Sequence, residues 1–214
     1  MIVSKQILKF VIERVVMPRM FIIAGCNGAG KTTASFTILP EILDCADYVN
    51  SDEIAKGLSP FNPEEVQIEA SKILICRMES LIKERKTFAI ETTLSTKALA
   101  KTVVKAQKEG YFVTLLFLWL SIPELAVERV NLRVASGGHN VSKDIIVRRY
   151  GMGIDNLFKV YIPICDYWIV IDNSGKASRL VAEGGLRIVT KVHNKILHRK
   201  LLDYERTRDE RDKG

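Results

Sequence analysis

Short apolar runs and longer amphipathic stretches alternate along the 214 residues of this chain. Five apolar, β-rich runs predict strands: Met20–Ala24, Tyr48–Asn50, Phe88–Ile90, Phe112–Leu120 and Tyr167–Ile171. The stretches between them predict helices, among which the clearest are Pro63–Arg85, Ser95–Lys108, Ser121–Val134 and Ser142–Tyr150. Alternation of this kind is typical of a parallel sheet wrapped by helices. We therefore expect a three-layer α/β/α fold with a mostly parallel five-stranded sheet.

Both ends of the chain add patterns of their own. Apolar residues recur at helical spacing near the start and predict an amphipathic helix within residues 1–19. A single domain follows over residues 20–190, with a small hairpin expected to turn at Gly184-Gly185. Residues 191–214 are rich in charge and predict a charged helix or tail.

The composition of the chain indicates which partners it can bind and in which cellular compartment it lies. The net charge of +7 favours anionic partners, and a nucleotide satisfies this as well as a nucleic acid does. The two Trp residues lie inside apolar strand runs, which argues against a base-stacking surface for nucleic acid. The four Cys residues show no CxxC spacing, so reduced thiols and a cytoplasmic location are expected. Charges interrupt the apolar start of the chain, and no membrane association is predicted.

Residues 25–32, Gly-Cys-Asn-Gly-Ala-Gly-Lys-Thr, fit the phosphate-loop pattern G-x-x-x-x-G-K-[ST] without a mismatch. A predicted strand precedes the loop and a helix follows it, which is the context the pattern requires. Lys31 is expected to bridge the β- and γ-phosphates of ATP or GTP, and the Thr32 hydroxyl to bind Mg²⁺. The predicted nucleotide-binding residues of this segment are Gly25, Asn27, Gly28, Ala29, Gly30, Lys31, Thr32 and Thr33.

The loop alone does not select a reaction. Residues 135–139 resemble the signature of ABC-type ATPases, and Ile169–Asp172 resembles the strand that carries their catalytic carboxylate. In those ATPases the strand follows the signature closely and ends in Asp-Glu. Here Asp172 lies far downstream and is followed by Asn173. An ABC-like ATPase or nucleotide switch is therefore the weaker alternative.

A small-molecule kinase needs a carboxylate near the transferred phosphate and a polar pocket for its acceptor. Asp52 lies just after the second predicted strand and is the candidate general base, with a helix N-cap as the alternative interpretation. Glu91, Thr93 and Ser95 follow the third predicted strand. Their polar groups suit a sugar or polyol, and the start of a helix is the alternative.

A kinase also needs cationic side chains that close over the phosphates. Arg129 and Arg133 are four residues apart and share one helix face. Arg148 and Arg149 lie on the next predicted helix, beyond the Gly137-Gly138 turn. Two arginine-bearing helices joined by glycines predict a closing lid, and solvated surface charge is the alternative for any one of them.

Taken in order, these motifs resemble the zeta-toxin family of P-loop kinases, in particular its short single-domain branch, from about Phe21 to Glu183. The segments that carry the resemblance are 25–33, 50–53, 88–95, 129–134, 137–139, 148–150 and 172–175. The resemblance implies transfer of a phosphoryl group from ATP or GTP to a hydroxyl of a small molecule, and an antitoxin protein as partner. In well-known members the acceptor is a UDP-N-acetylhexosamine. The basic net charge favours a different alternative, a kinase that acts on the ends of nucleic acids.

The resemblance also implies a role for each site residue. Those implied in catalysis are Lys31, Asp52, Arg133 and Arg148, with Arg149 as the substitute for Arg148. Those implied in acceptor binding are Asp52, Glu91, Thr93, Ser95 and Arg129. Asn173 lies in the loop that such kinases place near the adenine. One position departs from the family, because the better-known toxins carry an arginine where this chain has Ser95, and the lost charge speaks against a diphosphate-bearing sugar.

Overall fold

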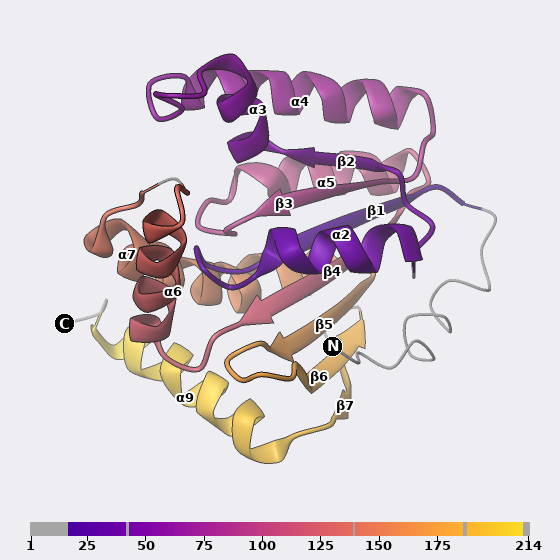
Figure 1. Ribbon diagram of the computed structural model, residues 1–214. Coiled ribbons are helices and arrows are strands. Elements are labelled where there is room, and N and C mark those ends of the chain that lie inside the picture. Colours follow the sequence, from indigo (N-terminus) through magenta and orange to yellow (C-terminus); the bar gives the residue numbers. More distant parts are fainter. Residues whose placement is uncertain (1–16, 42, 139, 186–187, 212–214) are drawn as a thin grey trace.

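One seven-stranded sheet runs through the part of the chain that the computed structural model describes, residues 17–41, 43–138, 140–185 and 188–211. Its strands are β1 (Arg19–Ala24), β2 (Asp47–Asn50), β3 (Phe88–Thr92), β4 (Phe112–Trp119), β5 (Tyr167–Asp172), β6 (Arg179–Gly185) and β7 (Ile188–Val192). The order across the sheet is β2-β3-β1-β4-β5-β6-β7 (Figure 1). The five predicted strands are parallel to one another, and β6 and β7 continue the sheet antiparallel.

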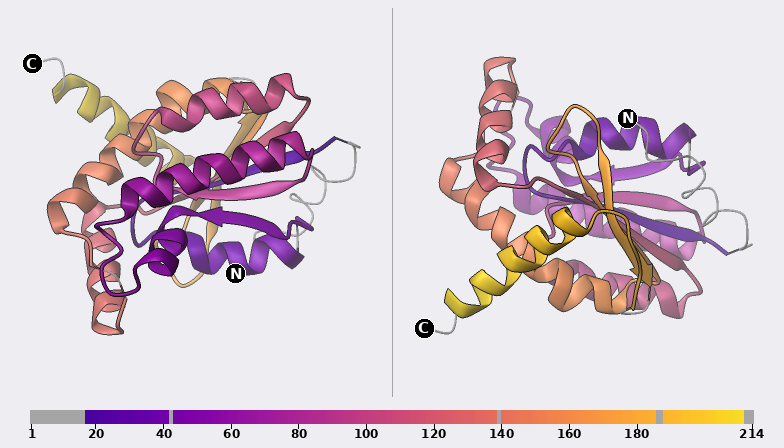
Figure 2. Two further views of the ribbon diagram at one scale, coloured as in Figure 1. Left: turned by 90° about the horizontal axis from the view of Figure 1, so that it is seen from above. Right: turned by 90° about the horizontal axis from the view of Figure 1, so that it is seen from below.

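Helices cover both faces of this sheet. They are α2 (Lys31–Glu41), α3 (Ser51–Leu58), α4 (Gln67–Lys83), α5 (Ala98–Lys108), α6 (Pro123–Ala135), α7 (Lys143–Asn156), the π-helix η1 (Leu157–Tyr161), α8 (Ile162–Ile164) and α9 (Lys195–Arg211). Figure 2 shows α2 on one side of the sheet and α5 and α9 on the other. Every residue of β4 from Val113 to Trp119 is buried, which explains its unbroken apolar sequence. The predicted three-layer α/β/α fold is confirmed.

The hairpin differs from the prediction in two ways. It joins the main sheet and raises the strand count from five to seven, because β6 pairs with the otherwise open edge of β5. Gly184 and Gly185 lie within β6 and do not form the turn. A Cβ at Gly184 would lie 2.0 Å from the carbonyl oxygen of Ile188 and 2.7 Å from the Trp168 ring. These glycines therefore allow a close approach inside the sheet.

The two terminal segments are also placed differently from the predicted boundaries. Residues 1–16 of the predicted amphipathic helix lie outside the described residues, and Arg19 belongs to β1, where it pairs with Phe112 of β4. At the other end, Lys191 and Val192 belong to β7 and pair with β6. The predicted charged helix therefore begins at Lys195 and not at residue 191.

The C-terminal helix α9 packs against α7. The Arg208 Nη2 atom lies 3.0 Å from Asp155 Oδ2, and the rings of Tyr150 and Tyr204 meet edge-on with centroids 5.2 Å apart. Gly151 makes room for this contact, since a Cβ there would lie 2.0 Å from Arg208 Nη1. Within the described residues, no helix is both long enough and apolar enough to cross a membrane.

Candidate functional site

The phosphate loop joins β1 to α2 at the carboxyl end of the central strands. Gly25, Gly28 and Gly30 have φ angles of +146°, +77° and +83°, a region that side chains rarely adopt. A Cβ at Gly25 would lie 2.3 Å from the Leu118 carbonyl oxygen, so the loop also passes too close to β4 for any side chain. The spacing of the glycines thus follows from the backbone path. The loop leads into the N-terminus of α2, where the first N–H groups of a helix favour an anion.

Lys31 and Thr32 meet a carboxylate from the neighbouring strand β3. Lys31 is buried, and its Nζ donates to the Cys26 carbonyl oxygen at 3.1 Å and lies 3.7 Å from Glu91 Oε1. The Thr32 hydroxyl donates to the two carboxylate oxygens of Glu91 at 3.0 and 3.2 Å. The register of the sheet produces this contact, because Ile23 of β1 pairs with Glu91 of β3. Glu91, which the sequence predicts as an acceptor-binding residue, therefore lies at the phosphate end of the site.

Tyr48 on β2 was not anticipated from the sequence. Its hydroxyl donates to Glu91 Oε2 and accepts from Asn50 Nδ2, which is 3.2 Å away. Burial, and then the nearby Glu91 carboxylate, raise the pKa of Tyr48 above its usual range, so the phenol stays protonated and acts as a donor. The available signal was its position two residues before Asn50, which places both side chains on one face of the strand.

The Thr32 hydroxyl and the Glu91 carboxylate fit a magnesium ion. Both are hard oxygen ligands, and they lie 3.0 Å apart at the end of the phosphate loop. Magnesium in nucleotide sites usually takes one or two protein ligands and completes its shell with phosphate oxygens and water. Among the described residues no cluster of three or more His, Cys, Asp or Glu side chains could hold a metal without a nucleotide.

Asp52 lies in the first turn of α3, and it is exposed. The N-cap of this helix is Asn50, whose Oδ1 accepts from the Asp52 backbone N–H at 2.9 Å. The alternative interpretation of Asp52 as the helix cap is therefore wrong. Its carboxylate is left to face the cavities described next.

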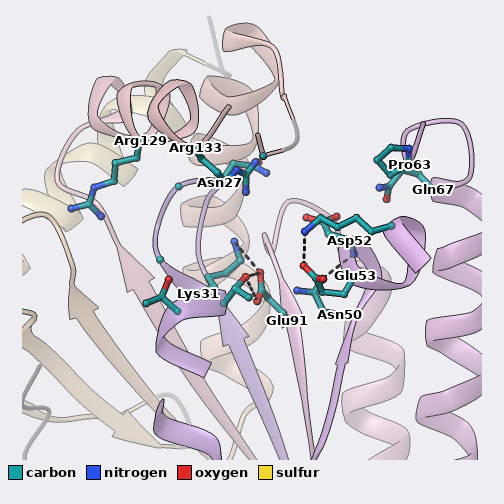
Figure 3. A pocket seen from close by; sticks show the side chains of 16 residues that line it. Asn27, Lys31, Asn50, Asp52, Glu53, Pro63, Gln67, Glu91, Arg129 and Arg133 are labelled. Atoms are coloured by element: carbon teal, nitrogen blue, oxygen red, sulfur yellow. Dashed lines mark hydrogen bonds and ion pairs between the residues drawn. The ribbon is translucent and has the colours of Figure 1, made fainter. Parts of the chain in front are cut away.

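Two adjoining cavities meet at Asp52. The phosphate cavity, of about 380 Å³, is lined by Asn27, Gly28, Gly30, Lys31, Thr32, Thr33, Asn50, Asp52, Glu53, Lys56, Pro63, Gln67, Glu91, Arg129, Arg133 and Gly138 (Figure 3). The side cavity, of about 340 Å³, shares Lys31, Asn50, Asp52, Gln67 and Glu91 with it. It extends between α4 and α5 to Thr93 and Ser95, and Arg149 also lines it. The structure thus brings the predicted acceptor residues of β2 and β3 next to the phosphate loop.

The predicted lid consists of α6 and α7, beyond the carboxyl ends of the strands (Figure 1). Arg129 is half-buried, lines the phosphate cavity and donates to the Ser174 carbonyl oxygen at 3.1 Å. Arg133 is exposed and lines the same cavity. Arg149 Nη1 lies 3.4 Å from Asn27 Oδ1 of the phosphate loop. Arg148 is exposed and is not among the residues that line either cavity, so Arg149 is the better placed of the pair.

Asn173, directly after β5, braces the phosphate loop. Its Nδ2 donates to the Ala29 carbonyl oxygen at 2.8 Å, and its Oδ1 accepts from the Ser178 hydroxyl at 2.7 Å. The preceding Asp172 is fully buried, and its Oδ2 lies 2.6 Å from Arg179 Nη2. Because Arg179 occupies that carboxylate and Asp172 does not line the phosphate cavity, the geometry disfavours the ABC-like interpretation.

Cys26 is the only thiol within the phosphate-loop segment, residues 25–32. Burial raises its pKa to about 11, so it remains a neutral thiol near pH 7. Its carbonyl oxygen accepts from Lys31, which is a structural role. Covalent catalysis through this cysteine is therefore not supported.

The fold and the site together define the class of this protein. A phosphate loop, a helical lid with arginines and a second cavity beside the phosphates are the features of a P-loop protein of the kinase type. The family model described as "Zeta toxin" matches residues 5–180, more than half of the chain. The chain belongs to the zeta toxin family.

Individual proteins are similar to this chain in sequence or in fold. An uncharacterised protein of Haemophilus influenzae is 34% identical over 128 residues, which cover 59% of this chain and 88% of that protein. The crystal structure of AvrRxo1-ORF1:-ORF2 with ATP has a TM-score of 0.70 at 17% identity, over 92% of this chain and 66% of that chain. The PezAT toxin–antitoxin system of Streptococcus pneumoniae gives 0.61 at 17% identity, over 96% and 91%. This chain thus spans just under two thirds of the AvrRxo1 chain, and the two structures show the shared fold.

Proposed function

We propose that this protein is a kinase that transfers the γ-phosphate of ATP or GTP to a hydroxyl group of a small molecule. The observation that carries the proposal is the pair of cavities that share Asp52 and Glu91. A nucleotide in the phosphate cavity would present its terminal phosphate toward the side cavity, where an acceptor would lie. ATP as donor is supported by the structural likeness to the AvrRxo1 complex, which contains ATP.

The phosphate end of the site would hold the donor. Lys31 would exchange its contacts with Cys26 and Glu91 for the β- and γ-phosphates, and the loop N–H groups would bind the β-phosphate. Thr32 and Glu91 would hold Mg²⁺, which when bound neutralises charge on the phosphate oxygens. Tyr48 and Asn50 would keep the Glu91 carboxylate in place.

Asp52 would act on the acceptor. Its carboxylate accepts the proton of the acceptor hydroxyl while that oxygen attacks the γ-phosphorus. The bond between this phosphorus and the bridging oxygen breaks, and the nucleoside diphosphate leaves. Arg133 and Arg149, on the two lid helices, would stabilise the negative charge of the transferred group.

The side cavity favours a small acceptor over a nucleic-acid end. The residues that line it include no aromatic side chain on which a base could stack. Part of the fold is shared with the Pnkp1/Rnl/Hen1 RNA repair complex, at a TM-score of 0.52 and 22% identity over 65% of this chain and 45% of that chain. That likeness concerns the fold alone.

Incubation with ATP carrying a heavy-isotope γ-phosphate and a pooled metabolite extract would test the proposal. We expect mass spectrometry to reveal at least one metabolite that gains a labelled phosphoryl group. The same reaction with the Lys31→Ala variant is the blank. Release of labelled inorganic phosphate alone, at the same rate with and without extract, would identify an ATPase instead.

The lid arginines allow a matched comparison of neighbouring residues. We expect Arg149→Ala and Arg133→Ala each to lower transfer at least about tenfold with little change in nucleotide affinity, since the contact strengthens in the closed transition state. Arg148→Ala is the control, because Arg148 is exposed and does not line the cavities. Initial rates and nucleotide titrations of the three variants decide the matter. Equal, small effects in all three would mean that these arginines are solvated surface charges.

Tyr48 gives a conservative test of the phosphate end. Tyr48→Phe removes one hydroxyl that donates to Glu91, which corresponds to about 1 kcal/mol or roughly a fivefold loss of turnover. The half-saturating Mg²⁺ concentration should rise, because the Glu91 carboxylate is held less firmly. Magnesium titrations of the wild type and the variant measure this. An unchanged magnesium dependence would show that the Tyr48 hydroxyl does not hold the Glu91 carboxylate in place for magnesium.

The antitoxin partner that the family implies is part of this proposal. The rim of the phosphate cavity offers a surface for it, because Phe61 is fully exposed and Ile68 is 76% exposed, next to the cavity residues Pro63 and Gln67. Co-purification with a candidate partner protein would test it, and failure to form a complex would contradict it.

A further inference from the structure

The far end of the side cavity is built around a strained turn. Leu94 is buried and has a φ angle of +59°, which is uncommon for a bulky side chain. Its N–H donates to Thr92 Oγ1 at 3.1 Å, and its carbonyl oxygen accepts from Asn156 Nδ2 at 2.8 Å. The neighbours Thr93 and Ser95 share a hydrogen bond of 2.8 Å between their hydroxyl groups, and both line the cavity. The turn therefore presents a fixed pair of hydroxyls.

Helix α7 holds this turn from behind. A Cβ at Gly153 would lie 2.8 Å from the Thr93 carbonyl oxygen, so α7 approaches the turn as closely as glycine permits. Asn156, one turn further along α7, supplies the hydrogen bond to Leu94. Because backbone and buried side chains fix the turn, its hydroxyls are positioned before any ligand binds.

Apolar side chains from α4 and α5 also line the side cavity. They are Leu74, Ile75, Met78, Ala98 and Leu99, and Ser71 and Thr102 of the same two helices are in the lining as well. A ligand in this space would meet both hydroxyl groups and aliphatic carbon. This combination suits a sugar or cyclic polyol, which has hydroxyls at its edge and C–H groups on its faces.

Three of the four charged side chains that line the side cavity, Lys31, Asp52 and Glu91, also line the phosphate cavity. Lys31 and Glu91 face each other at 3.7 Å, and Arg149 points to Asn27 of the phosphate loop. Asp52 completes the charged residues among those that line the cavity. Both cations are therefore engaged at the phosphate end. A buried phosphate or diphosphate on the acceptor would need cations of its own, because an unpaired charge is costly to bury.

We infer that the acceptor of this kinase is an electrically neutral, hydroxyl-rich small molecule with an apolar face, of the size of a sugar or cyclic polyol. This inference rests on the proposed function and makes it more specific. It excludes acceptors that carry a diphosphate, such as nucleotide sugars. Thr93 and Ser95 are the residues that determine this specificity.

The test compares two acceptor pools at equal concentrations, with ATP as donor and mass spectrometry as readout. One pool contains neutral sugars, amino sugar derivatives and cyclic polyols, and the other contains sugar phosphates and UDP-sugars. We expect kcat/KM for the best neutral compound to exceed that for any anionic compound at least a hundredfold. Transfer to anionic compounds alone overturns the inference and leaves the kinase function standing. No transfer to either pool, with ATP still bound, overturns both.

Two variants test the residues themselves, with the neutral acceptor found in the first experiment. Thr93→Val removes one hydroxyl at nearly constant volume and should raise KM for this acceptor at least fivefold while ATP affinity stays the same. Ser95→Arg adds a cation and should raise the KM for the neutral acceptor further. Titration should show that the same variant binds anionic compounds more tightly than wild type does. Thr190→Arg, at an exposed position on β7 outside the side cavity, is the control for added charge. Unchanged KM in both Thr93→Val and Ser95→Arg contradicts their role in specificity.

Discussion

Replacing Asp52 by asparagine is expected to lower phosphoryl transfer at least about a hundredfold while ATP affinity stays within a few-fold of wild type. The variant keeps the size of the side chain but removes its negative charge, and with it the ability to accept the proton of the acceptor hydroxyl. The structure makes the result interpretable, because Asn50 and not Asp52 caps α3. Asp52 contributes to the helix only through the favourable N-terminal position of its charge, about 0.3–1 kcal/mol. The melting temperature should therefore fall by no more than about 2–4 °C.

An acidic residue at the start of another helix gives the control for Asp52. Glu69→Gln removes an exposed carboxylate from the first turn of α4, at a position that lines neither the phosphate cavity nor the side cavity. We expect this change to alter transfer by less than about threefold, as for an ordinary surface substitution. Transfer rates, nucleotide titrations and thermal melts of both variants are the measurements. Similar transfer rates in Asp52→Asn and wild type would mean that a group other than Asp52 takes the proton from the acceptor hydroxyl.

The second large effect is expected from Lys31→Ala, which should lower turnover below about 1% of wild type. The Lys31 Nζ is the cation held against the Cys26 carbonyl oxygen and the Glu91 carboxylate at the point where the phosphates would lie. Without it, the charge that develops on the transferred group loses its main partner from the loop. Thr32 and Tyr48 still donate to Glu91, so this carboxylate is not left without hydrogen bonds and the fold should survive.

Lys105→Ala serves as the control for Lys31, because Lys105 is exposed and pairs with Glu79 on the surface of the molecule. It should leave turnover and melting temperature near the wild-type values. Steady-state turnover and circular dichroism of the two variants are sufficient. Normal turnover in Lys31→Ala would show that the lysine of the phosphate loop is not needed for the reaction.

The order of strands along the chain was readable from the sequence, and the order across the sheet was not. The phosphate loop and the five parallel strands follow from a local motif and from apolar runs, which need no long-range information. The contact between Thr32 and Glu91 depends on β1 lying beside β3. Tyr48 reaches Glu91 for the same reason, since β2 pairs with β3. Pairings of this kind are properties of the folded sheet.

Two further differences come from close packing and helix phase. Gly184 was interpreted as a turn residue, but it allows close contact with Ile188 and Trp168 inside the sheet. Arg148 and Arg149 cannot be ranked without the phase of α7, because adjacent residues on a helix point about 100° apart. The structure sets that phase and turns Arg149 toward the phosphate loop.

The packing of α9 on α7 has a consequence for how the protein is made. The helix that carries Arg149 is held by Tyr204 and Arg208, which follow every strand of the sheet in sequence. A nascent chain that has emerged only as far as β7 can pair its strands, but the contacts behind Tyr150 and Asp155 are still missing. The lid would therefore gain its final support only after α9 has been synthesised, later than every strand of the sheet.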